Sequence, residues 1–75
     1  MYNGHPSRNY WNVSLWIGND EGRYRLALEC IRSAKNRKEA ARAMFDILAE
    51  SGQAKTPDGA PYTQASILHA MRGLE

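Results

Sequence analysis

The single cysteine, Cys30, is the feature that most constrains what this chain of 75 residues can fold into. With one cysteine no intrachain disulfide can form, which is typical of a protein made for a reducing compartment such as the cytoplasm. A domain of this size hides only about 60% of the surface that its unfolded chain exposes. The sequence therefore predicts one domain, residues 1–75, with a small core that no disulfide supports.

The segment NYWNVSLWIGNDEG, residues 9–22, holds both tryptophans of the chain. Apolar residues alternate with polar ones along part of residues 10–17, as in a half-buried strand, but Trp11 and Leu15 also have the spacing of one helix face. No other segment offers a partner strand, and an isolated strand leaves its backbone groups unpaired. We therefore expect a short helix here, and a strand remains the alternative if two chains pair.

The two indole rings are the largest apolar groups that this chain can bury. Each buries about 150 to 250 Å², so a bundle of short helices gains most by placing Trp11 and Trp16 near its centre. Their separation corresponds to a rotation of about 140° on a helix, so both rings cannot point straight into one core. We expect Trp11 in the core and Trp16 at its edge, where it packs against Tyr24 or faces a partner.

Two further helices are predicted from capping residues and apolar periodicity. Asp20 is a good N-cap, and the amphipathic pattern that follows it extends to about Ala34. Asn36, with Glu39 three residues later, resembles a capping box that opens a helix running to Ser51. Because only two or three residues join them, these helices should form an antiparallel or steeply crossed hairpin.

The remaining segments complete an all-α prediction. Thr56-Pro57-Asp58-Gly59 has the signature of a tight turn in a surface loop. Thr63 can cap a last helix that ends at Gly73, and residues 1–9, rich in Asn, Gly, Pro and Ser, are expected to form an irregular N-terminal arm. The expected fold is a small bundle of about four short helices in a single domain.

Residue groups that support catalysis or hold a metal or cofactor are not found in this sequence. His5 lies in the arm, His69 on the last helix, and Cys30 is expected to be a core thiol. One cysteine gives no zinc spacing, and no glycine-rich phosphate loop is present. We therefore predict no catalytic, metal or cofactor-binding residue, and no enzyme. No apolar run approaches the roughly 18 to 20 residues that span a bilayer, so we expect no membrane partner.

Positive charge is concentrated where the second and third predicted helices meet, although the net charge of the chain is only +2. This cluster consists of Arg32, Lys35, Arg37, Lys38 and Arg42. It is either a solvated turn, a contact for a nucleic-acid backbone or a contact for an acidic protein surface. Together with Trp16 and Tyr24, these residues are the candidates for binding a partner. Sequence-specific reading of DNA is not expected, because the third helix presents mainly alanines.

Two quoted segments carry a resemblance to a known family. YNGHPSRNYWNVSLWIGNDEGRY, residues 2–24, and the later TPDGAPY resemble small uncharacterised bacteriophage proteins with the pattern YNG, TWNVALWI, NDEGLY and a TPDG turn. This chain has Tyr10 where the family often has threonine, which removes a possible threonine cap for the first helix. It has Arg23 where leucine is usual, which places a charge at the position of an apolar contact. The resemblance implies a phage accessory protein in the host bacterial cytoplasm.

We therefore expect a small non-catalytic, phage-derived protein that engages a host protein or protein complex, for example as an inhibitor of a host defence system. A first alternative is a nucleic-acid-binding module that uses the basic cluster, for which steep salt dependence is diagnostic. A second alternative is a structural homo-oligomer. Independently of the function, a homodimer or a monomer–dimer equilibrium is expected, because a partner subunit is the remaining common way to stabilise so small a core.

Overall fold

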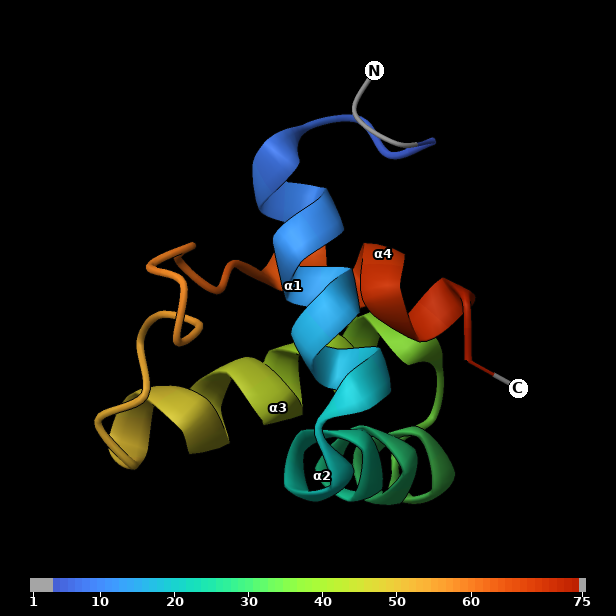
Figure 1. The fold of residues 1–75 in the computed structure, drawn as a ribbon. Helices are drawn as coiled ribbons and strands as arrows, with labels where there is room; N and C mark the ends of the chain where they lie inside the picture. Colours follow the sequence, from blue (N-terminus) through green and yellow to red (C-terminus); the bar gives the residue numbers. More distant parts are fainter. Residues whose placement is uncertain (1–3, 75) are drawn as a thin grey trace.

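A computed structural model of the chain describes residues 4–74, which fold into four helices around one core (Figure 1). The helices are α1 (Arg8–Asn19), α2 (Glu21–Ser33), α3 (Arg37–Glu50) and α4 (Gln64–Arg72). The all-α prediction is confirmed, and residues 10–17 are helical rather than extended. Arg8 and Asn9, assigned above to the irregular arm, already belong to α1, and residues 1–3 of that arm lie outside the described residues.

Each helix begins at a side chain that accepts a hydrogen bond from a backbone N–H of its first turn, which satisfies one of the amides that a helix start leaves unpaired. At Asn36 the side-chain oxygen accepts from the Glu39 N–H at 2.9 Å. The reciprocal bonds of a full capping box are present between Thr63 and Ser66. Three of the caps are as predicted, and the cap of α1 was not foreseen. The four caps are Ser7, Asp20, Asn36 and Thr63.

The helices contact one another in a closed order. Helix α1 packs against α2 and α4, and α3 packs against the same two helices. In Figure 1, α2 is seen nearly end-on while α3 runs across the picture, so the predicted hairpin of these helices is a steep crossing. Small residues, Ala27 on α2 with Ala40 and Ala41 on α3, are fully or almost fully buried. Side chains of this size allow crossing helices to approach closely.

Aliphatic side chains fill the core, and the two tryptophan rings do not. Val13 and Ile17 of α1 are fully buried, whereas Trp11 and Trp16 are only partly buried, so the expectation of Trp11 in the core is wrong. At 100° per residue, Trp11 lies roughly 160° around the helix from Val13 and therefore faces away from the other helices. Cys30 lies in the core as expected, and burial raises the pKa of its thiol, with the Glu29 charge adding to the effect.

A polar network centred on Asn12 holds the long connection between α3 and α4, residues 51–63, against α1. The Asn12 side chain is only 2% exposed. Its amide nitrogen donates to Asp58 Oδ2 at 2.9 Å, and its oxygen accepts from Thr56 Oγ1 at 2.6 Å. Trp16 Nε1 also donates to Asp58 Oδ2, at 2.9 Å. Both polar ends of a buried amide are thus satisfied, which is the condition for burying it at little cost.

The connection reaches α1 as the tight turn that the sequence predicts. The Gly59 N–H donates to the Thr56 carbonyl at 2.8 Å, and Gly59 has φ of +92°, a conformation that glycine adopts without steric cost. The Thr56 hydroxyl accepts from the Ala60 N–H at 3.1 Å. An isolated antiparallel bridge between Lys55 and Pro61 closes the base of the turn. These hydrogen bonds fix the turn, and the turn places the Asp58 carboxylate beside α1.

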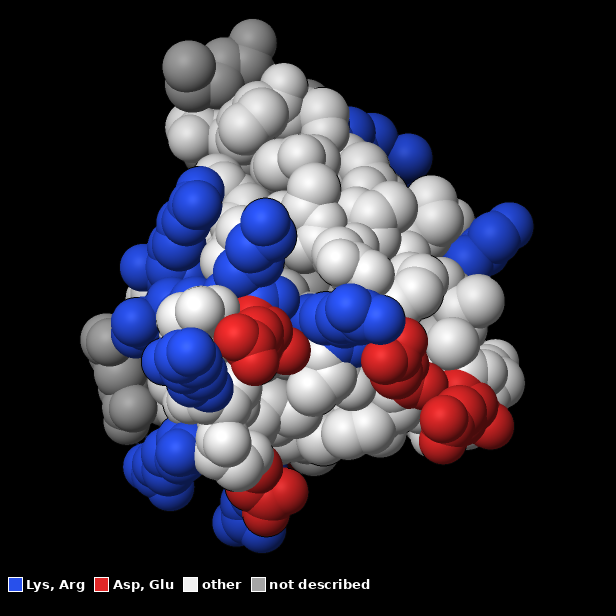
Figure 2. All heavy atoms as spheres, turned by 180° about the vertical axis from the view of Figure 1, so that it is seen from behind, with Lys and Arg blue, Asp and Glu red and all other residues white. Residues whose placement is uncertain are grey.

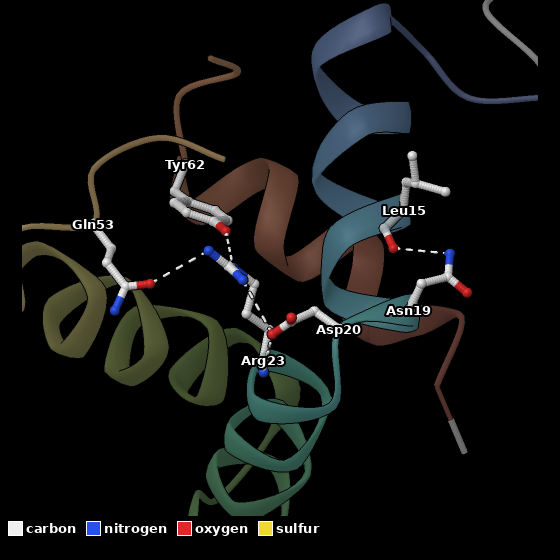
Figure 3. Close-up of polar contacts among 6 residues, drawn as sticks. All are labelled: Leu15, Asn19, Asp20, Arg23, Gln53 and Tyr62. Carbon is white, nitrogen blue, oxygen red and sulfur yellow. Dashed lines mark hydrogen bonds and ion pairs between the residues drawn. The ribbon is translucent and has the colours of Figure 1, made fainter. Parts of the chain in front are cut away.

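Arg23, near the start of α2, holds the two flanks of the same connection (Figure 3). Its Nε donates to the Tyr62 hydroxyl at 2.7 Å, and one terminal nitrogen donates to Gln53 Oε1 at 3.4 Å. The other terminal nitrogen pairs with Asp20 at 3.1 Å, and the guanidinium carbon lies 5.6 Å from the centre of the Trp16 ring. The charge of Arg23 is therefore used for hydrogen bonds, an ion pair and a cation–π contact.

Replacing Ile17 with alanine should destabilise the protein more than replacing Trp11, although tryptophan is the larger side chain. Ile17→Ala removes fully buried methyl groups and leaves a cavity, which costs about 2 to 5 kcal/mol. Trp11→Ala removes a ring that already contacts water on part of its surface. Urea unfolding of both variants measures the difference in the free energy of unfolding. A larger loss for Trp11→Ala would contradict this account of the core.

The contribution of Asp58 to stability should depend on pH. Hydrogen bonds from Asn12 and Trp16 lower the pKa of Asp58 below its ordinary value of 3.8, because they favour the charged carboxylate. A pKa that is lower in the folded state stabilises the fold above the unfolded pKa, and this stabilisation is lost as the pH falls through the folded pKa. Asp58→Asn should therefore unfold more easily than the wild type at neutral pH. Urea unfolding should show this difference shrinking below pH 3.8, and a difference that stays constant with pH would contradict the assignment.

Candidate binding surface at the α2–α3 junction

Four of the five predicted cationic residues lie exposed around the connection between α2 and α3. Arg32 is in the last turn of α2, Lys35 lies in the connection, and Lys38 and Arg42 are in the first two turns of α3. Figure 2 shows Lys and Arg side chains gathered along the side of the molecule that carries this connection and the end of α4, with a few acidic side chains among them. We call Arg32, Lys35, Lys38 and Arg42 the basic junction.

Arg37, the fifth predicted cation, is used inside the fold. Its Nε donates to the Met71 carbonyl at 3.2 Å, and a terminal nitrogen donates to the Leu74 carbonyl at 3.0 Å. These carbonyls lie at the end of α4, where a helix leaves acceptors without partners and carries a partial negative charge. Arg37 therefore fixes the end of α4 beside the start of α3. It belongs to the support of the basic junction rather than to its exposed surface.

Lys35, Lys38 and Arg42 are the members of the basic junction whose charge is not paired within the described part of the chain. No acidic side chain within residues 4–74 forms an ion pair with Lys35, Lys38 or Arg42. Lys38 also lies in the first turn of α3, where the helix dipole disfavours a cation by about 0.3 to 1 kcal/mol. Arg32, in the last turn of α2, has the opposite and favourable position. Lys38 is thus held at a position where its charge disfavours the helix.

A shallow groove lies directly beside the basic junction. It has a volume of about 240 Å³ and lies between α3 and α4. Lys38 and Gln64 provide its polar edge, and the side chains of Ala41, Ala65 and Leu68 provide its apolar lining. The surface on this side therefore combines an apolar depression with a cationic rim.

The structure does not bring the two predicted aromatic contacts to this surface. Tyr24 is 36% exposed but lies near the start of α2. It is eight residues before Arg32, which corresponds to about 12 Å along a helix. Trp16 donates a hydrogen bond to Asp58 and lies against Arg23, so its ring is engaged within the fold and is not free to bind a partner as expected. The seven predicted partner-binding residues thus separate into the basic junction, one internal arginine and an aromatic pair elsewhere on the molecule.

The described residues contain neither a cluster of metal ligands nor a helix that could span a membrane. Within residues 4–74, no three side chains of His, Cys, Asp or Glu are grouped so that they could hold a metal ion. None of the helices in this part of the chain has the length and apolar character needed to cross a bilayer. The groove between α3 and α4 was not foreseen from the sequence, because its two walls are more than twenty residues apart and no local pattern connects them.

Comparison with known proteins places the chain in a family. No curated protein and no solved structure gives a significant match to it. The sequence pattern of a protein family, by contrast, matches residues 1–74, which include all four helices and both quoted segments. The chain therefore belongs to DUF7249, a family of unknown function.

Proposed function

We propose that this is a non-catalytic binding protein of a bacteriophage, which uses the basic junction to engage an acidic surface of a host protein in the bacterial cytoplasm. The observation that carries the proposal is the placement of Lys35, Lys38 and Arg42, exposed and without an acidic partner among residues 4–74, beside an apolar groove. An exposed cation at the edge of an apolar depression, with two further unpaired cations close to it in the chain, matches the polar rim and apolar centre of protein interfaces.

An acidic protein surface fits these residues better than a nucleic-acid backbone does. The groove supplies apolar contact area, which a phosphate backbone does not use. The exposed Tyr24, which could stack on a base, lies at the other end of α2. Nucleic-acid binding through the same cations is the alternative that the experiment below separates.

The phage origin and the type of target follow from the resemblance of residues 2–24 and the TPDG turn to small bacteriophage proteins. A small helical protein without a metal cluster in its described residues can act by occupying a host surface. Host defence complexes are one class of such surfaces. Inhibition of a defence complex is therefore the form of the proposal that we favour.

Reversing three charges, with Lys35→Glu, Lys38→Glu and Arg42→Glu in one variant, should abolish capture of the host partner from bacterial lysate. Arg37 is left in place because it supports α4. Exposed substitutions usually change stability by about 0.5 kcal/mol or less each, so the helical signal should be unchanged. With the purified partner, the variant should associate more slowly, because complementary charge acts mainly on the association rate.

A matched control carries the same change in net charge elsewhere: Arg8→Glu, Arg25→Glu and Lys55→Glu, all exposed positions. This control should capture the partner as the wild type does, and nuclease should leave the complex intact. Loss of capture after nuclease, with a steep fall in affinity between low and physiological salt, would indicate nucleic acid instead. Equal capture by both reversed variants would refute the basic junction as the interface. A solution mass above one chain that changes only in the junction variant would favour the homo-oligomer.

A further inference from the structure

A second site, separate from the basic junction, lies between the N-terminal segment, α1 and the end of α4. It is a cavity of about 520 Å³, within the range of small-molecule sites. Among residues 4–74, its lining includes three residues with cationic or protonatable side chains, His5, His69 and Arg72, and no acidic residue. Sixty-four positions separate the two histidines in the chain, so the packing of α4 against α1 creates this arrangement.

The two histidines are in direct contact. His5 Nδ1 and His69 Nε2 are 2.8 Å apart, and the ring of Tyr10 lies 5.2 Å from that of His69. A hydrogen bond between two imidazoles leaves His5 Nε2 and His69 Nδ1 available for another partner. The pKa of His69 is lowered by burial and by the positive charges of His5 and Arg72. Arg72 gives the edge of the cavity a permanent positive charge, so a negative charge in the cavity would be stabilised.

Two further residues of the cavity wall, Ser14 and Gly18, have energetically unfavourable features that packing within the fold does not explain. The Ser14 hydroxyl is buried and has no hydrogen-bond partner, which costs about 1 to 3 kcal/mol. Gly18 lies within α1, where glycine is about 1 kcal/mol less favourable than alanine. A Cβ at Gly18 would meet no atom within 4 Å, so packing does not require glycine there. Gly18 therefore leaves this part of the wall open without a packing reason in the described fold.

We infer that this cavity binds a small organic phosphate monoester. Its terminal oxygens would accept hydrogen bonds from Arg72 and from whichever of His5 Nε2 and His69 Nδ1 carries a proton, and its organic part would lie against the Ala70 and Leu74 side of the lining. A phosphate monoester uses more of these donors than a carboxylate, which has two oxygens. The carbonyls of Met71 and Leu74, which would repel an anion at the end of α4, already accept from Arg37. This site does not depend on the function proposed for the basic junction.

Titration of the isotope-labelled protein with phenyl phosphate, followed by NMR, tests the inference. The amides of Gly18 and Gly73, both on the cavity wall, should shift in a saturable way at millimolar ligand. Bound phosphate should also raise the pKa of His69, because a dianion offsets the charges of His5 and Arg72 that lower it. Benzoate should bind more weakly. A nucleoside monophosphate and a hexose phosphate, titrated separately, identify which organic part is preferred.

Two variants and a control locate the site. Gly18→Leu should fill the cavity, and Arg72→Gln removes an exposed charge at its edge; each should weaken phenyl phosphate binding about tenfold or more. Gly22→Leu, a substitution of another exposed helix glycine outside this cavity, should leave binding unchanged. Well-dispersed amide spectra show that each variant is folded.

The inference would be overturned by any of three results. The first is a wild type whose cavity amides do not shift, and the second is a set of shifts confined to the basic junction. The third is unchanged binding in both Gly18→Leu and Arg72→Gln. If inorganic phosphate binds as tightly as phenyl phosphate, the organic part makes no contact, and the assignment to a monoester is wrong. A pKa of His69 that does not rise in the presence of saturating ligand would also count against the site.

Discussion

The buried side chain of Asn12 is the interaction on which most of this structure depends. Its amide group connects α1 to Thr56 and Asp58, and so it fixes a connection of thirteen residues that contains no helix of its own. The position of Trp16 follows, because its indole nitrogen shares Asp58 as an acceptor. The start of α4 follows as well, since the connection leads directly into it. The hydrogen bonds of this one side chain thus connect segments that are far apart in a small chain that no intrachain disulfide supports.

The charged side chains form two groups: some bind other parts of the fold, and others stay at the surface. The residue composition does not show to which group a given side chain belongs. Arg23 and Arg37 reach inward and bind the loop and the end of α4, and their planar guanidinium groups contact several acceptors at once. Lys35 and Lys38, with flexible ammonium groups, remain at the surface. The two arginines make polar contacts between segments that are too short to bury much apolar area. The lysines contribute little to the fold, and a binding role is compatible with that position.

The helices could be predicted because their signals are local. Capping residues such as Asp20 and Thr63 act within one turn, and the apolar periodicity that follows them is read from adjacent residues. The position of Trp11 could not be predicted, because its spacing to Leu15 fits a face that turns away from the core as well as one that turns toward it. The basic junction was visible because its members are close in sequence. The contacts of Arg37 inside the fold could not be predicted, because its acceptors lie 34 and 37 residues later, and no local pattern reveals them.

The closed order of helix contacts has a consequence for synthesis on the ribosome. Helix α1 is made first, but one of its two partner helices, α4, is made last. Until residues 64–72 leave the ribosome, the part of α1 that packs on α4 stays uncovered, although α2 and α3 can already form their local hairpin. A nascent chain halted before that point would expose apolar surface to chaperones and proteases. Translation of the last helix is therefore the step that closes the core.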